Sequence, residues 1–127
     1  MAWVTIVALV ALIEYMFFGL QVGRARGQYN IEAPATTGHP MFDRAFRIHQ
    51  NTLEQLIVFL PALFAFAEYV HPLWAAGIGL VFVVGRAVYA AGYQAEPKKR
   101  GIGMMLSFIP NTVLLLGGVI GAAMKLF

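Results

Sequence analysis

The sequence predicts an all-α fold, an integral membrane four-helix bundle, from three observations. Of the 127 residues, 60% are hydrophobic and 12% are charged, whereas soluble domains are about 45–50% apolar and about 25% charged. The apolar residues form long runs, and at about 20 residues per span there is room for about four spans and no separate soluble domain. The basic residues stand beside these runs. We therefore expect a single membrane domain, 1–127, with helices at about 3–26, 41–69, 73–95 and 102–126.

The first helix is expected to be a membrane span rather than a removable signal peptide, because no basic segment precedes its apolar run and no small-residue cleavage site follows it. Trp3 suits one membrane interface, and Arg24 and Arg26 mark the other. Glu14 lies near the middle of the span, where a charged group is costly. Two interpretations stay open: a carboxyl group packed against a neighbouring helix, protonated or hydrogen-bonded, or a ligand or proton site.

The second helix begins with a polar segment, FDRAFRIHQNTLE (42–54), directly before an apolar run. A charged side chain near the centre of a spanning helix costs about 2.5–3.5 kcal/mol, so this segment is a candidate functional site. On an α-helix, Arg47, Asn51 and Glu54 fall within roughly 60° of one another. His49 points almost the opposite way, toward a different helix or another subunit.

The third helix follows a very short turn, so it should be the antiparallel neighbour of the second. Its last third places Arg86, Tyr89 and Tyr93 on one face. A basic link, QAEPKKRG (94–101), leads into the fourth helix, where Pro110 should cause a bend.

The distribution of basic residues predicts the membrane orientation. Arginines flank the first loop and Lys98, Lys99 and Arg100 lie in the third, whereas the second loop has no Lys or Arg. The positive-inside rule therefore places loops 1 and 3 in the cytoplasm and both termini on the other side. Both polar helix segments then lie on the cytoplasmic side and predict one site. We expect no nucleic-acid partner, since the basic residues serve topology and the site.

The residue types at this site favour a ligand that carries carboxylates and an ammonium group. Arginine binds carboxylates in bidentate fashion, Glu54 suits an ammonium, and Asn51 suits a peptide amide. Glutathione fits this description, as do other polar anions. Structural alternatives also stay open: Arg44 and Arg100 could reach lipid headgroups, and Tyr89 and Tyr93 could form an aromatic belt. The absence of cysteine excludes disulfides, thiolate metal sites and a cysteine nucleophile.

The chain resembles the MAPEG family (membrane-associated proteins in eicosanoid and glutathione metabolism), especially microsomal glutathione S-transferases of types 2 and 3 and leukotriene C4 synthase. The resemblance covers nearly the whole chain and rests on FDRAFRIHQNTLE (42–54), the segment from Gly85 to Tyr93, EPKKRGIG (96–103), LQVGRAR (20–26) and TTG (36–38). It implies a homotrimer of four-helix subunits, with glutathione bound between neighbours on the cytoplasmic side.

The resemblance also assigns roles to individual residues. Glutathione contacts from one subunit are implied for Arg47, Asn51, Glu54, Arg86, Tyr89 and Tyr93, and contacts from its neighbour for Arg26 and His49. Arg100 matches the arginine that stabilises the glutathione thiolate, a catalytic role that is physically sound because a free thiol, with a pKa of about 8.5, is mostly protonated at neutral pH. Two positions depart from the family pattern: His49 stands where many members have Gln, and Gln55 where several have Tyr.

The implied function is a membrane glutathione S-transferase that conjugates glutathione, its co-substrate, to lipophilic electrophiles without a metal. Glutathione-dependent reduction of lipid hydroperoxides is an expected second activity. Two alternatives remain: a non-catalytic lipid-binding scaffold of the same family, and a small proton-coupled multidrug exporter that uses Glu14 and has no need of the polar segments. The host membrane is expected to be a bacterial inner membrane or the endoplasmic reticulum.

Overall fold

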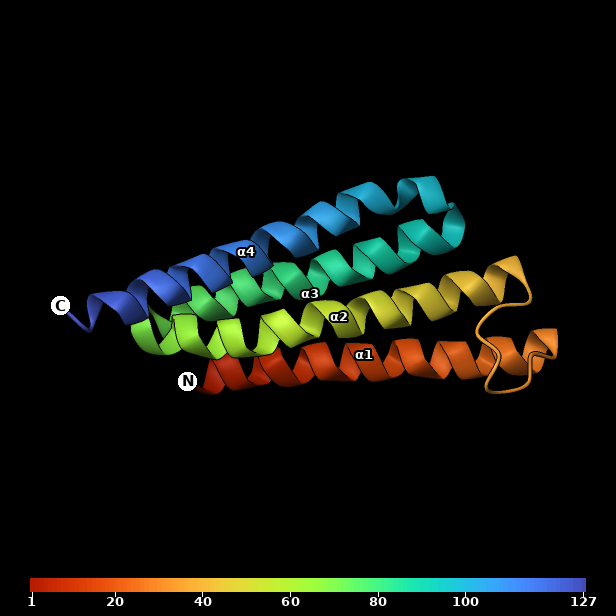
Figure 1. Cartoon of the computed structure of the whole chain (residues 1–127), viewed down its shortest axis with the longest axis horizontal. Coiled ribbons are helices and arrows are strands. Elements are labelled where there is room, and N and C mark those ends of the chain that lie inside the picture. The colour runs from red at the N-terminus through yellow and green to blue at the C-terminus, as the bar shows by residue number, and fades with distance from the viewer.

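Four long helices run side by side in the computed structural model, which describes residues 1–127. Both termini lie at one end of the bundle, and the 30–39 loop and the connection between the last two helices lie at the other (Figure 1). All four helices are long and apolar enough to cross a membrane, which confirms the predicted all-α membrane bundle. The elements are α1 (Ala2–Tyr29), α2 (Pro40–Tyr69), α3 (Pro72–Ala95), a short 3₁₀ helix η1 (Pro97–Arg100) and α4 (Gly101–Met124).

Local sequence signals account for the helix ends. Asn30 adopts a left-handed conformation (φ 55°) and ends α1, a position that favours Gly or Asn. His39 and His71 precede α2 and α3 in extended conformation, and the Nδ1 atom of each accepts a hydrogen bond from the backbone N–H two residues later, at 3.1 Å. A proline follows each histidine and occupies the first helical position, where the missing N–H costs nothing.

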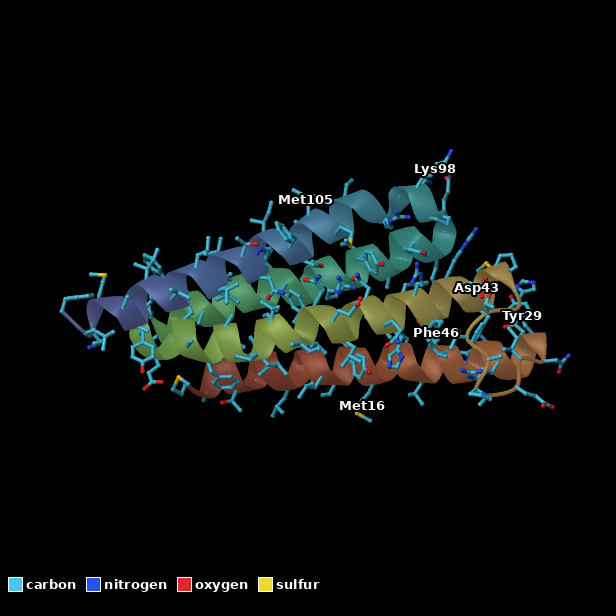
Figure 2. All side chains as sticks on the ribbon, viewed as in Figure 1. Met16, Tyr29, Asp43, Phe46, Lys98 and Met105 are labelled. Atoms are coloured by element: carbon cyan, nitrogen blue, oxygen red, sulfur yellow. The ribbon has the colours of Figure 1, made fainter.

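Apolar side chains fill the half of the bundle that contains the termini. Fourteen buried residues form one cluster there, in which the rings of Phe59 and Phe82 stack at 4.0 Å. Only 33 of 127 residues are buried, and many large apolar side chains are exposed. Met16 on α1 and Met105 on α4 point away from the bundle on opposite sides (Figure 2) and are 68% and 54% exposed. An apolar outer surface of this extent suits lipid rather than water.

Small residues bring α3 and α4 into very close contact near the loop end. A Cβ atom at Gly85 would lie 2.6 Å from the carbonyl carbon of Leu106, and Gly103 lies directly against the backbone of Tyr89. Neither position has room for a side chain, so the first two turns of α4 lie directly against the second half of α3. This contact places the start of α4 beside the polar face of α3.

The 30–39 loop folds against the ends of α1 and α2. The Arg26 guanidinium donates a hydrogen bond to the Ala35 carbonyl at 2.8 Å, and the rings of Tyr29 and His39 stack at 3.8 Å. Figure 2 shows Tyr29, Asp43 and Lys98 at this same end of the bundle. The polar segments of α2, α3 and η1 therefore meet at one end.

Candidate functional site

A cavity of about 280 Å³ lies among α2, α3, η1 and the start of α4. This volume is close to the lower limit for small-molecule sites, about 300 Å³. The cavity is lined by six of the nine residues predicted for the site and by two others. Its lining residues are Arg47, Gln50, Asn51, Glu54, Tyr89, Tyr93, Arg100 and Met104.

The amphipathic pattern of α2 turns one polar stripe toward the cavity. The opposite stripe, which includes Phe42, Ile48 and Leu56, is buried in the bundle. Burial of that stripe leaves Arg47 and Glu54 exposed, and Asn51 lies between them, half-buried. The helix therefore presents a guanidinium, an amide and a carboxylate along about two turns of one face.

The opposite wall combines two phenols and a guanidinium. The rings of Tyr89 and Tyr93 lie 5.7 Å apart at an interplanar angle of 56°. The Cζ atom of Arg100 lies 5.6 Å from the centre of the Tyr93 ring, and its Nη1 donates a hydrogen bond to the Pro97 carbonyl at 3.3 Å. The Tyr93 ring and the η1 backbone thus hold the exposed Arg100 head group at the cavity wall.

The charges around the cavity are unequal. Arg47 and Arg100 contribute two positive charges, and Glu54 contributes one negative charge. The cavity therefore attracts an anion but also offers one place for a cationic group. Bidentate guanidinium pairing with carboxylates and pairing of the Glu54 carboxylate with an ammonium are the interactions available.

Arg86 does not line the cavity but supports it from behind. It is fully buried, and its Nη2 donates to the Asn51 side-chain oxygen at 2.7 Å and to the Thr52 hydroxyl at 2.9 Å. Its Nε also faces the Thr52 hydroxyl at 3.3 Å, and its Cζ lies 4.3 Å from the centre of the Tyr89 ring. Because arginine can only donate, this contact assigns the Asn51 oxygen to Arg86 and leaves the amide NH₂ for a ligand.

Arg26 and His49 also lie outside the cavity, on the α1 side of the bundle. The Arg26 guanidinium bonds the Ala35 carbonyl and lies 4.9 Å from the centre of the Phe42 ring. The His49 ring stacks on Tyr15 of α1 at 4.4 Å. These two residues are therefore separated from the cavity of their own chain.

Gln50, Met104 and Thr52 complete the arrangement. Gln50 flanks the polar stripe of α2 in the sequence, so its place in the cavity follows the helical spacing. Met104 belongs to an apolar run and Thr52 lies on the buried stripe of α2, so neither carries a sequence signal of a site.

Gln55 does not line the cavity. Its side-chain oxygen accepts a hydrogen bond from Asn111 of α4 at 3.1 Å. No three His, Asp or Glu side chains lie together in a position to hold a metal ion.

Comparison with known proteins identifies the family. Residues 4–120 match the MAPEG family. An uncharacterized protein of Synechocystis sp. is 39% identical over 124 residues, 98% of this chain and 90% of its own. Human microsomal glutathione S-transferase 2 is 38% identical over 117 residues, 92% of this chain and 80% of the human one. Leukotriene C4 synthase of Cavia porcellus is 36% identical over 94 residues, 74% of this chain and 63% of its own. The chain therefore belongs to the MAPEG family, as its motifs predict, and is an integral membrane protein.

Proposed function

We propose that the protein is a membrane glutathione S-transferase and that glutathione occupies the cavity described above. The composition of the cavity carries this proposal: two guanidinium groups, one carboxylate and one free amide NH₂ match a tripeptide with two carboxylates, one ammonium and two peptide bonds. Relatives named as glutathione S-transferases support it. Arg47 would bind a carboxylate, Glu54 the ammonium, and Asn51 a peptide carbonyl.

Arg100 is the proposed catalytic residue. A guanidinium beside a thiol favours the thiolate, which is the reactive nucleophile. The thiolate attacks an electrophilic carbon, a sulfur–carbon bond forms, the leaving group departs with the bonding electrons, and the thiol proton passes to water at the exposed side of the cavity. Most of the acceleration then comes from positioning the sulfur and lowering the pKa of the thiol.

Reduction of lipid hydroperoxides is the proposed second activity of the same site. The thiolate would attack the O–O bond and release an alcohol, leaving an oxidised sulfur on glutathione. A second glutathione then forms the disulfide and releases water. Two glutathione molecules supply the two electrons, so no further cofactor is required.

We also propose that the functional unit is a homotrimer in which Arg26 and His49 serve the cavity of a neighbouring subunit. Their separation from the cavity of their own chain supports this proposal. The apolar outer surface also supports it, because it leaves area for contacts between copies within the membrane. The cavity is proposed to face the cytoplasm, because the basic residues gather at that end.

Replacement of Arg100 tests the proposed chemistry. Arg100→Gln should lower kcat for conjugation of a chromogenic aryl halide by about 100-fold, while glutathione affinity changes much less. The pH at which kcat is half-maximal should rise, because the thiolate loses its stabilising charge. The matched control is Lys98→Gln, which removes a positive charge from the same 3₁₀ helix outside the cavity and should leave kcat unchanged.

The alternative outcomes are distinct. Equal losses in kcat and in glutathione affinity would contradict the catalytic role of Arg100. Glutathione binding by the unaltered protein without conjugation would favour a non-catalytic scaffold. No glutathione binding at all would overturn the proposed function.

A further inference from the structure

Glu14 is an acidic residue that the proposed function does not use. It lies on the face of α1 that packs into the bundle, one turn from the buried residues Ala11 and Phe18. Its Oε1 atom is buried and has no hydrogen-bond partner. A carboxyl group in this position is costly unless something compensates its charge or its hydrogen-bonding capacity.

Arg86, on α3, is a buried cation whose hydrogen-bond partners carry no negative charge. Its side chain is 0% exposed, and the groups that accept its hydrogen bonds, on Asn51 and Thr52, are both neutral. Its Nη1 atom has no partner. Hydrogen bonds to neutral oxygens orient a guanidinium but do not balance its charge, and an unbalanced buried charge is strongly destabilising.

The two unsatisfied groups lie at the same level of two neighbouring helices that run in the same direction (Figure 1). Seven residues before them, a Cβ atom at Gly79 of α3 would lie 2.9 Å from Cγ1 of Val7 of α1, and four residues after them Phe18 and Ala90 pack in one buried cluster.

Glu14 is the carboxylate whose charge acts on Arg86. Glu54 lies exposed in the cavity, and Asp43 accepts a hydrogen bond from the Gly38 N–H at the loop end. Attraction between opposite charges is strongest where water is excluded, so this pair counts for more than a surface pair.

We propose that Glu14 is the counter-ion of Arg86 within the membrane and thereby a positioning residue for the ligand cavity. Asn51 and Tyr89 both line the cavity, and Arg86 holds the first by a hydrogen bond and lies against the ring of the second. Glu14 balances the charge of Arg86 from α1, on the side away from the cavity, and so keeps the guanidinium behind these two residues. The effect on glutathione rests on the proposed function, whereas the pairing of Glu14 with Arg86 does not.

Glu14→Gln preserves the shape of the side chain and removes its charge. We expect KM for glutathione to rise about tenfold, because Asn51 loses its fixed orientation. The kcat value should stay within about twofold, since neither Glu14 nor Arg86 lines the cavity. Glu14→Asp keeps the charge and should recover most of the lost affinity, which a purely space-filling role would not predict. Glu68→Gln, which removes an exposed carboxylate from α2, is the control.

A double-mutant cycle with Arg86→Gln tests whether Glu14 acts through Arg86. Glu14→Gln should lower the Tm of the otherwise unaltered protein by about 4 °C or more, and should have no further effect on Tm or KM once Arg86 is replaced. Additive effects, or a Glu14→Gln variant with unchanged KM and Tm, would overturn the proposal. If the unaltered protein does not conjugate glutathione, the proposed function fails, and the Tm cycle alone still decides whether Glu14 and Arg86 are coupled.

Discussion

At the scale of single residues, Thr52 is as important for holding Arg86 in place as the charged groups are for the cavity. Its side chain is fully buried, and its hydroxyl oxygen faces both Nε and Nη2 of Arg86. The hydroxyl and the Asn51 oxygen together fix the plane of the guanidinium. Loss of either acceptor would leave part of a buried cation without a hydrogen bond, which costs more than the loss of a neutral hydrogen bond.

Thr52→Val therefore should destabilise the protein by about 2 kcal/mol, because it removes the acceptor of two N–H groups at nearly constant volume. Thermal unfolding in detergent measures this change. Thr112→Val is the matched control, since the Thr112 hydroxyl donates to the Phe108 carbonyl of its own helix at 2.9 Å and makes no link between helices. Equal Tm values for the two variants would contradict the role of Thr52.

The sequence predicts which side chains of α2 line the cavity, because the spacing of residues along a helix determines which side chains point the same way. Arg47, Asn51 and Glu54 share a face at spacings of four and seven residues, and the structure places all three in one cavity. Spacing around one helix does not define depth, however. Arg86 shares a face with Tyr93 by the same rule, yet it is buried behind the cavity, because the small residues near it admit α4 so closely.

At the scale of helices, the contact between α3 and α4 sets the shape of the cavity. Tyr89 lines the cavity, and its backbone lies directly against Gly103. Any side chain at position 103 would force the two helices apart. The cavity and this helix contact are therefore coupled.

Gly103→Ala should destabilise the protein by about 1–3 kcal/mol, the usual cost of overpacking. It should also weaken glutathione binding, because Tyr89 would move. Gly77→Ala is the control: a Cβ atom there meets nothing within 4 Å, so the higher helix propensity of alanine should leave stability unchanged or raise it by up to about 1 kcal/mol. Similar Tm changes for both variants would contradict the importance of the close contact.

The helices themselves could be predicted from the sequence, but their closest contact could not. Long apolar runs predict membrane spans whichever helices they pack against. The two-residue connection Val70–His71 requires that α2 and α3 be antiparallel neighbours. By contrast, glycines occur at many positions. Gly117 and Gly121 in α4 also lie against α2, at Phe66 and Tyr69, and nothing in the sequence singles out Gly85 and Gly103 from them.

At the scale of the whole molecule, the proposed orientation has a direct test. The chain has no cysteine, so a single introduced cysteine can be labelled selectively. Cysteine at Lys98 should react with a membrane-impermeant reagent from the cytoplasmic side, and cysteine at Val70 from the opposite side. Labelling in intact and inverted vesicles measures this. The reverse pattern would contradict the orientation.

The proposed trimer predicts complementation between inactive subunits. Arg26→Gln and Arg100→Gln should each lower activity when glutathione is scarce. In mixed trimers, about a quarter of the cavities would pair an intact Arg100 on one subunit with an intact Arg26 on its neighbour. Coexpression should therefore restore activity above that of either variant alone. No gain on mixing would place Arg26 outside the site.

The apolar surface beside the cavity has a consequence for substrate preference. Met104 lines the cavity, and its neighbour Met105 points outward from α4 (Figure 2), so the cavity borders both the aqueous end and the lipid-facing surface. For the proposed transferase activity, the bilayer would then act as a reservoir that concentrates the second substrate before it reaches the cavity. Each added methylene contributes about 0.8 kcal/mol to partitioning, about a fourfold enrichment. Selectivity among electrophiles would then follow their partition coefficients as well as their fit to the protein.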